Sequence, residues 1–514
     1  MSRPVQTFKH VRGYRPGRSV FDLSYSKTGT CDMGELIPIA CDEMVPGDKF
    51  IIGSQAVIRF QPIVAPILHR IDMYVHYFFV PYRLLWNAQT REDLSESGDW
   101  ETFITGGSDG DSAPTLPTWD PTNYGEASLW DYLGFPIDVY PEGVLPVDFP
   151  RRAYNLVYNE FYRDETLHTR VAWTNEDILN RCWTKDYFTS ALPWQQRGTS
   201  PGLPLSGYTT AEWPSGAFLN AAGGVALQAS TTLGNDDLYV NSANGRTNME
   251  DFFARNVVDL SSATPFDIND MRLAFQIQRW LERNARGGYR YIEWLQTNFA
   301  TSPRDDTLQR PVYIGGSKSP IIVSEVLQTS ETDTTPQGTL AGHGITVNDS
   351  FCGKYYAQEF GLLLGIMSVI PKPMYQQGIN RQWLKETKYD YYNPVFANLG
   401  EQAVLNAEIF VTSSAPVTNQ DIFGYQGRYN EMRSKQDMVC GAMRSDAATS
   451  YDYWHLARDF ASVPTLNSTF VECVPRKDIF AAPSEPGLVF QFGNLIKAIR
   501  PIPIIAEPGY IDRN

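Results

Sequence analysis

The clearest candidate for chemistry is a basic segment at the start of the 514-residue chain. Residues 1–18 hold five cations, no acidic residue and two aromatic rings between them. The set is Arg3, Lys9, Arg12, Arg15 and Arg18, with Phe8 and Tyr14. Cations neutralise phosphates and aromatic rings stack on bases, so the pattern is typical of an arm that binds single-stranded DNA. A solvated tail, or an arm bound to the acidic face of a neighbouring subunit, would have the same composition.

The rest of the chain is acidic and rich in aromatic residues. The formal net charge is −15 at pH 7, and because residues 1–18 carry +5, the remainder carries −20. A basic arm on an acidic body is the asymmetry expected when one end of a protein meets a polyanion. Charged residues make up 20% and aromatic residues 13% of the chain, which is typical of a surface that partners cover.

Several short motifs resemble enzyme or ligand sites, but the residues around them do not supply the structure that such sites need. Residues Gly106–Gly110 match G-x-S-x-G, but the prolines that follow prevent the helix that a nucleophile elbow needs. Asp109 and Asp111 lack the ligand run of a calcium loop, so a solvated turn is favoured. Gly315–Ser319 lacks the spacing of a phosphate-binding loop. The sequence therefore predicts no enzyme and no cofactor.

Histidines and cysteines show no metal-binding spacing. The six histidines form no H-x-x-x-H pair, and we expect His76 and His455 to be packed, hydrogen-bonded residues. The six cysteines form no C-x-x-C pair, which predicts reduced, mostly buried thiols in a protein assembled in cytoplasm. No apolar signal region follows the basic start, and the longest apolar run, near Phe360–Pro371, is too short for a bilayer. We expect no membrane insertion.

The segment Arg70–Pro81 is the anchor of the expected fold. Its residues alternate between an apolar face and a face that begins polar and ends apolar, which predicts a central strand covered on one side and partly on the other. A buried helix of this length is the alternative, but helical spacing leaves no clean apolar stripe. Further strands are predicted at 35–40, 50–60, 360–371, 402–411, 467–474 and 488–505.

Helices are predicted in the middle of the chain. Residues 150–165 carry apolar positions at i, i+3, i+4 and i+7. Residues 267–288 place Leu273, Ile277 and Leu281 on one stripe, with Asp267 as a candidate N-cap. Shorter helices are expected at 86–103 and 289–299. Residues 199–265 are rich in Gly, Ser, Thr, Ala and Asn, a composition that fits a long surface insertion.

Together these elements predict a mainly β protein. Strands near both ends imply that N- and C-terminal strands pair with each other, as in a single eight-stranded jelly-roll sandwich with long helical and loop insertions. The expected divisions are a basic arm (1–30), first strands (31–85), a helical and loop insertion (86–198), a surface insertion (199–265), a helical segment with connecting loops (266–350), and the remaining strands with a C-terminal tail (351–514).

Long motifs along the chain resemble a known family. They include Ser19–Ser24, Leu36–Asp48, Phe78–Trp86, Arg152–Asp164, Asp186–Gly198, Arg272–Glu293, Gln309–Gly316, Tyr375–Trp383, Phe396–Asn406, Phe423–Tyr429, Trp454–Ser468 and Arg500–Asp512. The chain resembles the major capsid proteins of the Microviridae, in particular the gokushovirus-like branch of small single-stranded DNA bacteriophages. The matching motifs leave out mainly residues 106–145, 199–265 and 328–350.

The resemblance implies a structural protein of the virion, assembled in the cytoplasm of a bacterial host. It implies a T=1 icosahedral capsid of sixty copies, held by fivefold, threefold and twofold contacts around a circular single-stranded DNA genome. Residues 199–265 correspond in place to an insertion that forms protrusions at the threefold axes and meets a host cell-surface receptor. An internal scaffolding protein and a DNA pilot protein would be further partners.

A jelly-roll lectin or carbohydrate-active enzyme is the rival reading. Its Trp and Tyr residues would stack on sugars, and an enzyme of this kind would place two carboxylates across a cleft. The sequence marks no such pair, and this reading leaves the basic arm unexplained.

Overall fold

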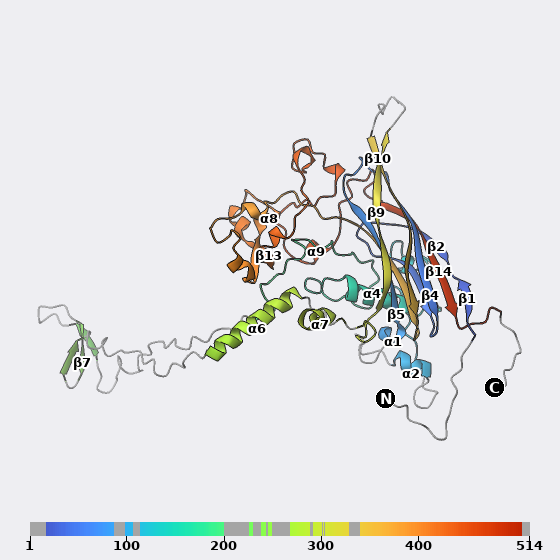
Figure 1. Cartoon of the computed structure of the whole chain (residues 1–514), viewed down its shortest axis with the longest axis horizontal. Coiled ribbons are helices and arrows are strands. Elements are labelled where there is room, and N and C mark those ends of the chain that lie inside the picture. Colours follow the sequence, from blue (N-terminus) through green and yellow to red (C-terminus); the bar gives the residue numbers. More distant parts are fainter. Residues whose placement is uncertain are drawn as a thin grey trace, which may run out of the picture. The chain divides into compact units, whose positions relative to one another are not determined.

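The computed structural model describes most of the chain (Figure 1). The described residues are 17–86, 98–105, 114–199, 226–229, 238–242, 245–248, 268–287, 291–300, 302, 304–327 and 340–505. They fall into two units, one of residues 1–195 with 287–514 and one of residues 196–286, and each is described by itself.

The anchor strand lies at the centre of the first unit, as predicted. Strand β5 (Ile71–Pro81) pairs antiparallel with β9 (Val312–Leu327) on one side and β11 (Gly361–Pro371) on the other. Both of its faces are covered, and only Tyr74 and His76 are half-buried. The sequence pattern underestimated this cover because aromatic side chains such as His76 and Phe78 pack against an insertion instead of solvent.

A single curled antiparallel sheet forms the sandwich. Its order is β1 (Ser19–Asp22), β14 (Leu488–Arg500), β4 (Lys49–Phe60), β10 (Leu340–Tyr356), β9, β5, β11 and β3 (Ile37–Met44), with β2 (Tyr25–Cys31) pairing with β14 beside β1. The first part of β9 pairs with β5 and its last part pairs with β10, so this long hairpin joins the two halves. The fold is a mainly β jelly-roll sandwich with insertions, in which N-terminal and C-terminal strands pair as expected.

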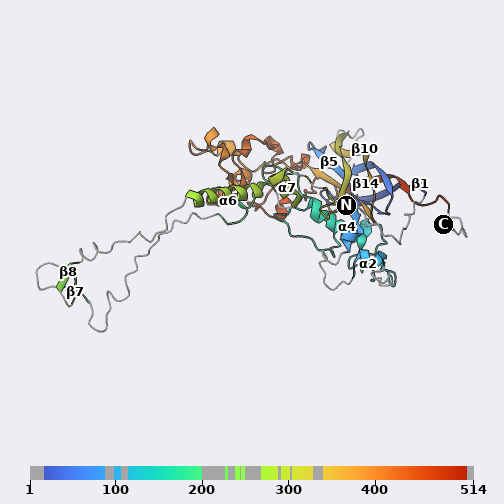
Figure 2. The ribbon, with the colours of Figure 1, turned by 60° about the horizontal axis from the view of Figure 1, so that its bottom comes forward.

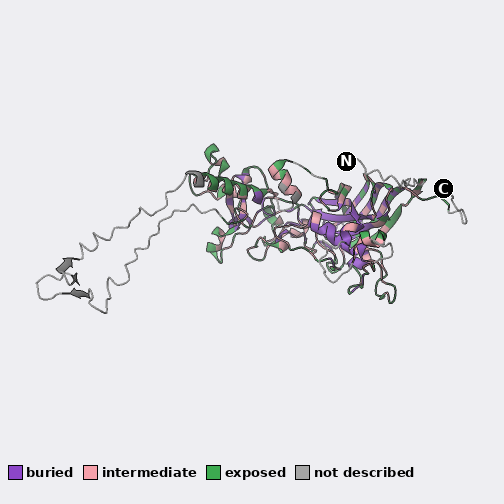
Figure 3. Cartoon of the chain, turned by 90° about the horizontal axis from the view of Figure 1, so that it is seen from below, coloured by how far each residue is buried: buried purple, intermediate pink, exposed green. Residues whose placement is uncertain are grey.

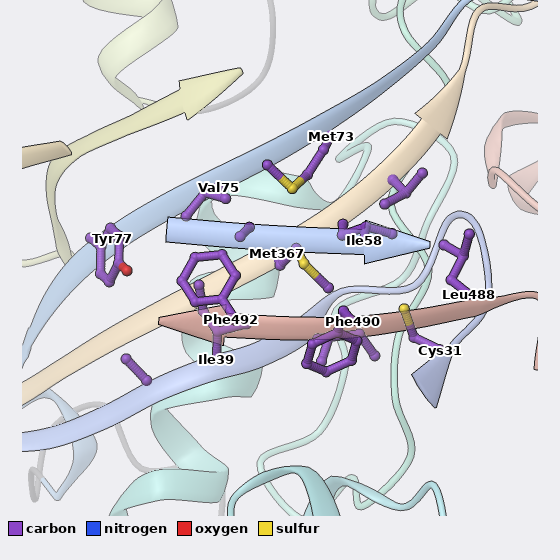
Figure 4. Close-up of a cluster of buried hydrophobic side chains, with 14 of the residues drawn as sticks. Cys31, Ile39, Ile58, Met73, Val75, Tyr77, Met367, Leu488, Phe490 and Phe492 are labelled. Atoms are coloured by element: carbon purple, nitrogen blue, oxygen red, sulfur yellow. The ribbon is translucent and has the colours of Figure 1, made fainter. Parts of the chain in front are cut away.

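The core lies between the two halves of the sheet. Figure 4 shows Met73, Val75 and Tyr77 of β5 facing Phe490 and Phe492 of β14. Strands β4 and β14 alternate buried and exposed residues along their length, because one face meets the core and the other meets solvent. Figure 3 shows burial concentrated in the sandwich, with exposed residues along its outer strands.

One buried polar link crosses this apolar core. The Tyr77 hydroxyl donates a hydrogen bond to Oδ1 of Asn494 (2.8 Å), and the Asn494 amide donates to the carbonyl of Ile39 (2.8 Å). Asn494 and Tyr77 have no exposed surface, so these hydrogen bonds satisfy groups that would otherwise be costly to bury. The link ties β14 to both β5 and β3.

The helical insertion covers the opposite face of β5 and β11. It contains α1 (Tyr82–Leu85), α2 (Trp100–Thr105), α3 (Leu129–Tyr132) and α4 (Phe149–Val157), and α4 runs on into the π-helix η1 (Tyr158–Tyr162). The predicted helix at 150–165 is therefore confirmed. Trp86, Trp119, Trp130 and Tyr154 are fully buried in this second cluster. Phe78 and Leu364 meet them from the sheet.

Short elements replace two of the expected strands after β11. Residues 402–411 form β12 (Glu401–Leu405), which pairs only with β13 (Ile422–Gly427), and then turn into α8 (Asn406–Ile409). Residues 467–474 begin with the helical turn α9 (Ser468–Val471), which the Asn467 side chain caps. The strand prediction was wrong at 467–474 because local capping by Asn467 outweighs the β propensity of its Thr, Phe and Val residues. Short 3-10 turns η3 to η8 fill the remaining length: Arg381–Trp383, Pro394–Asn398, Pro416–Gln420, Asn430–Met432, Gly441–Met443 and Asp452–Trp454.

Three further expectations need correction. The sheet contains nine strands among the described residues instead of eight. Residues 19–30, assigned to the arm, lie largely in β1 and β2, because an extended segment beside β14 completes that strand's hydrogen bonding. Residues 266–350, expected to be helix and connecting loops, contain most of the β9–β10 hairpin. Its Gly, Ser and Thr residues hide the alternation that marks a strand.

The second unit contains the other predicted long helix. Helix α6 (Ile268–Arg286) is continuous over 19 residues (Figure 2), while the candidate cap Asp267 lies outside the described residues. Its apolar stripe is not buried, since Leu273 is 59% and Ile277 38% exposed. Strands β6 (Ala226–Ala229), β7 (Leu238–Ser242) and β8 (Gly245–Asn248) form a small sheet. Helix α7 (Tyr291–Phe299), also predicted, belongs to the first unit.

Candidate interaction surfaces

Of the seven residues predicted to contact DNA, the structure describes Arg18. The other six, Arg3, Phe8, Lys9, Arg12, Tyr14 and Arg15, lie outside the described residues. Arg18 is exposed, its guanidinium lies over the ring of Tyr356 (5.5 Å), and it donates a hydrogen bond to the Tyr356 hydroxyl (3.2 Å). An exposed guanidinium beside an exposed ring can contact both a phosphate and a base.

A buried ion pair anchors the sheet next to Arg18. The carboxylate of Asp48, which is fully buried, accepts hydrogen bonds from Nε (3.1 Å) and Nη2 (2.9 Å) of Arg500. Arg500 also donates to the carbonyl of Glu43 (2.8 Å) and lies opposite Ser19 in the ladder. The first strand of the described chain is therefore paired with a strand end that this ion pair holds in place.

A large cavity lies over the outer face of β5. Its volume is about 910 Å³, and its wall combines rings of β5 and η1 with cations from the following loops. The ring of His76 stacks on Tyr162, and its Nδ1 is 2.8 Å from the Tyr162 hydroxyl. The guanidinium of Arg181 lies 4.4 Å from the Tyr74 ring centroid and donates to the hydroxyl of Ser368 (3.1 Å). Such a wall can hold an anionic or flat ligand.

The electrostatics of this cavity do not favour catalysis. Burial, helped by the charge of Arg181, lowers the pKa of His76 to about 4, so the ring is neutral at pH 7. Burial raises the pKa of the Cys182 thiol to about 11, which keeps it protonated and unreactive. Asp305 is the only carboxylate among the described lining residues, and it pairs with Arg310 (2.7 Å). A pair of carboxylates for glycoside chemistry is missing from this wall.

The glycine-rich motifs and His455, singled out in the sequence, either have structural roles or lie outside the described residues. Gly315–Ser319 lies inside β9, so it forms part of a sheet and no phosphate loop. Gly106–Gly110 and the two nearby aspartates lie outside the described residues. His455 is buried, and its Nε2 is 2.7 Å from the carbonyl of Met443, as expected of a packed histidine.

Cysteines and metal-ligand types make no site in the described part of the chain. All six cysteines are free: Cys31, Cys352 and Cys473 are buried, Cys41 and Cys182 are half-buried, and Cys440 is exposed. Within the described ranges, His, Cys, Asp and Glu residues nowhere gather in a group able to hold a metal. Across those same ranges, every helix is too short or too polar to cross a bilayer.

A buried charge cluster, which sequence reasoning missed, fixes the helical insertion. Oδ1 of Asp148 accepts from Nε of Arg151 (2.6 Å), and its Oδ2 accepts from Nε of Arg152 (2.7 Å). Arg151 also reaches Glu176 (3.1 Å), whose other hydrogen bonds hold Trp119 (2.8 Å) and the turn after it. The spacing of Asp148 to Arg151 and Arg152, at i+3 and i+4, was the available signal.

The turns after β11 carry several exposed apolar side chains. Trp383 is 75%, Tyr391 61% and Val395 79% exposed. Exposed apolar side chains of this kind are typical of surfaces that other proteins cover, which is what the aromatic-rich composition led us to expect.

Comparison with known proteins places the chain in a family. The family described as capsid protein (F protein) matches residues 9–510. The capsid protein VP1 of Chlamydia phage 1 is 33% identical, over 96% of this chain and 95% of the relative. VP1 of Bdellovibrio phage phiMH2K is 33% identical over 99% and 98%, and VP1 of Spiroplasma virus 4 is 29% identical over 98% and 97%.

These matches extend through the sandwich and its insertions alike, and they agree with the jelly-roll architecture. They confirm the resemblance to the capsid proteins of gokushovirus-like Microviridae. The chain belongs to the capsid protein (F protein) family.

Proposed function

We propose that this protein is the non-enzymatic subunit of a T=1 icosahedral capsid, in which sixty copies enclose a circular single-stranded DNA phage genome. The observation that carries the proposal is the match to the capsid protein family over residues 9–510. A shell subunit acts by symmetric association, because self-complementary contacts close into a point group instead of growing into fibres.

Exposed apolar surface supports association between copies. Trp383, Tyr391 and Val395 expose apolar surface to water, and a neighbouring subunit that covered this surface would gain favourable free energy of burial. Ile504 and Ile505, 75% and 76% exposed at the end of the described chain, would likewise bury against a neighbour. Fivefold, threefold and twofold contacts would each use part of this surface.

The proposed partners follow from the same reading. The basic arm contacts the genome, and residues 199–265 face outward and bind a host cell-surface receptor. An internal scaffolding protein and a DNA pilot protein assist assembly in the bacterial cytoplasm, and the mature protein resides in the virion.

Sedimentation velocity on the native protein from its producing cells tests the shell directly. Sixty chains of 58.0 kDa give a mass on the order of 3.5 MDa. We expect one sharp boundary at that mass, with nucleic acid absorbance that co-sediments and resists nuclease. A persistent monomer would contradict the proposal.

The role of the arm is tested by charge removal. Changing Arg3, Lys9, Arg12, Arg15 and Arg18 to Gln should lower the nuclease-resistant DNA per particle, because five phosphate contacts are lost. The control changes Arg70, Lys372 and Lys477 to Gln, which are solvent-accessible cations outside both the arm and the exposed apolar turns. Normal DNA content in the arm variant would contradict the assignment.

A further inference from the structure

One face of the sheet formed by β1, β14, β4 and β10 is open to solvent. Along β14 the residues Val489, Gln491, Leu495 and Lys497 are exposed, while the residues between them fill the core. Strand β4 alternates in the same way, since Lys49 and Gln55 are exposed and Phe50 and Ile52 are buried. No described element of the chain packs over this face.

Cations concentrate at one end of this open face. The ladder places Lys354 of β10 and Lys497 of β14 on either side of Ile51 in β4, which separates the two lysines by about 10 Å. Lys49 lies two residues from Ile51 on the same face and opposite Tyr356. All three lysines are exposed.

Few carboxylates balance these charges. The open face carries Arg59, Lys49, Lys354 and Lys497 against Asp22 and Asp349, whereas the whole chain has a net charge of −15. Asp22 lies opposite Lys497 and interacts with its charge, while the backbone and the hydroxyl of Ser24 donate to its Oδ1. The four cations still exceed the two carboxylates on this face. A basic surface on an acidic protein fits a polyanion.

Two exposed rings accompany the lysines. Phe351 is 67% and Tyr356 45% exposed on β10. Directly opposite Phe351 the neighbouring strand has Gly53, which offers no side chain to cover the ring. Tyr356 lies opposite Lys49, and Phe351 lies on the same strand as Lys354, so an open ring beside a lysine can stack a base whose phosphate the lysine neutralises.

The open face is continuous with the root of the basic arm. Arg18 precedes β1 and reaches Tyr356 of β10, and the sheet order places β14 and β4 between these two strands. Residues 1–16 add four more cations in sequence just before it. The last cation of the basic segment, Arg18, therefore lies at the basic end of this face.

We propose that the open face of β1, β14, β4 and β10 is the surface that faces the genome, and that it binds single-stranded DNA through Lys49, Lys354, Lys497, Phe351 and Tyr356. This inference rests on the proposed function and extends it from the arm to the folded domain. It also orients the subunit, with this face toward the lumen of the shell.

Ultraviolet cross-linking inside native particles, followed by mass spectrometry of the peptides, locates the contacts. We expect DNA adducts on peptides that contain Phe351 and Tyr356, in addition to adducts in the arm. Adducts confined to residues 1–18 would overturn this inference and leave the proposed function intact. Shells whose nucleic acid yields adducts only on another protein of the particle would overturn it as well.

A salt titration measures the same contacts on the full-length chain with oligo-dT as the probe. Changing Lys49, Lys354 and Lys497 to Gln should reduce the slope of log Kd against log salt by about 2, as expected for three lost phosphate contacts. The lysine-to-arginine triple variant should keep the slope, and so should a variant with Arg70, Lys372 and Lys477 changed to Gln, which lie outside the open face. An unchanged slope in the first variant, with an unchanged melting temperature, would overturn the proposal.

Discussion

Asp148 has 1% of its surface exposed and is held by two arginines, so its charge depends on those partners. Changing Asp148 to Asn should lower the free energy of unfolding by about 3–5 kcal/mol. The positive charges of Arg151 and Arg152 would stay buried without the carboxylate that neutralises them. Thermal unfolding followed by circular dichroism measures the loss. The control, Asp306 to Asn, breaks an exposed pair with Arg304 and should change stability by less than about 1 kcal/mol. Equal effects would contradict the role of burial.

His69 and His76 make the fold sensitive to acid. Burial lowers both pKa values to about 4, whereas an unfolded histidine titrates near 6.5. Between pH 6.5 and 4 the unfolded chain therefore binds more protons than the folded one, and stability falls as the pH falls. Each site contributes up to about 1.4 kcal/mol per pH unit in this window.

Urea unfolding at pH 7 and pH 5 tests this expectation. Changing His69 and His76 to Gln should flatten the difference between the two pH values, while His343 to Gln should leave it unchanged. A double variant that loses as much stability between pH 7 and pH 5 as the parent would show that other groups control acid unfolding.

Among the elements, the β5–β9 pairing depends on a close approach of two backbones. A Cβ added at Gly316 would lie 2.2 Å from the carbonyl oxygen of Val75, so Gly316 to Ala should cost about 1–3 kcal/mol through forced strand separation. Gly427 to Ala is the control, since the atoms nearest to its Cβ lie at 3.8 and 3.9 Å. Melting temperatures of the two variants provide the measurement. A Gly316 variant that melts at the same temperature as the Gly427 variant would contradict the close approach of β5 and β9.

Elements with strong local periodicity were predictable, and those without it were not. Strand β5 and helices α4 and α6 carry their apolar spacing in their own residues, so they were found. Strands β9 and β10 were missed because Gly, Ser and Thr occupy many of their positions, and their identity depends on pairing with β5 and β4. The segment 467–474 failed for the opposite reason, because a local cap outweighed its β propensity.

For the whole molecule, the proposed outward position of residues 199–265 has a direct test. Limited proteolysis of intact particles should cleave first within this segment, because its composition gives little apolar surface to bury against neighbours. Mapping the first fragments by mass spectrometry provides the measurement, with disassembled protein as the control. Early cleavage at turns of the sandwich, with 199–265 protected, would contradict the assignment.

The sequence by itself determined the mainly β class, the central strand, the principal helices, the family resemblance and the charge contrast between arm and body. These properties reside in local periodicity, in composition and in the order of motifs, all of which exist before any segment meets another. The sequence also identified the arm as the candidate contact with DNA, and Arg18 is the part of that set that the structure describes.

The tertiary structure alone decided which surfaces those segments build. Lys49, Lys354 and Lys497 are separated by hundreds of residues, and only the register of β10, β4 and β14 places them on one face. The cavity over β5 likewise joins rings of β5 and η1 with Arg181 and Arg310. The physical reason is that strand pairing and burial are set by contacts between distant segments, which the local alternation of side chains does not encode.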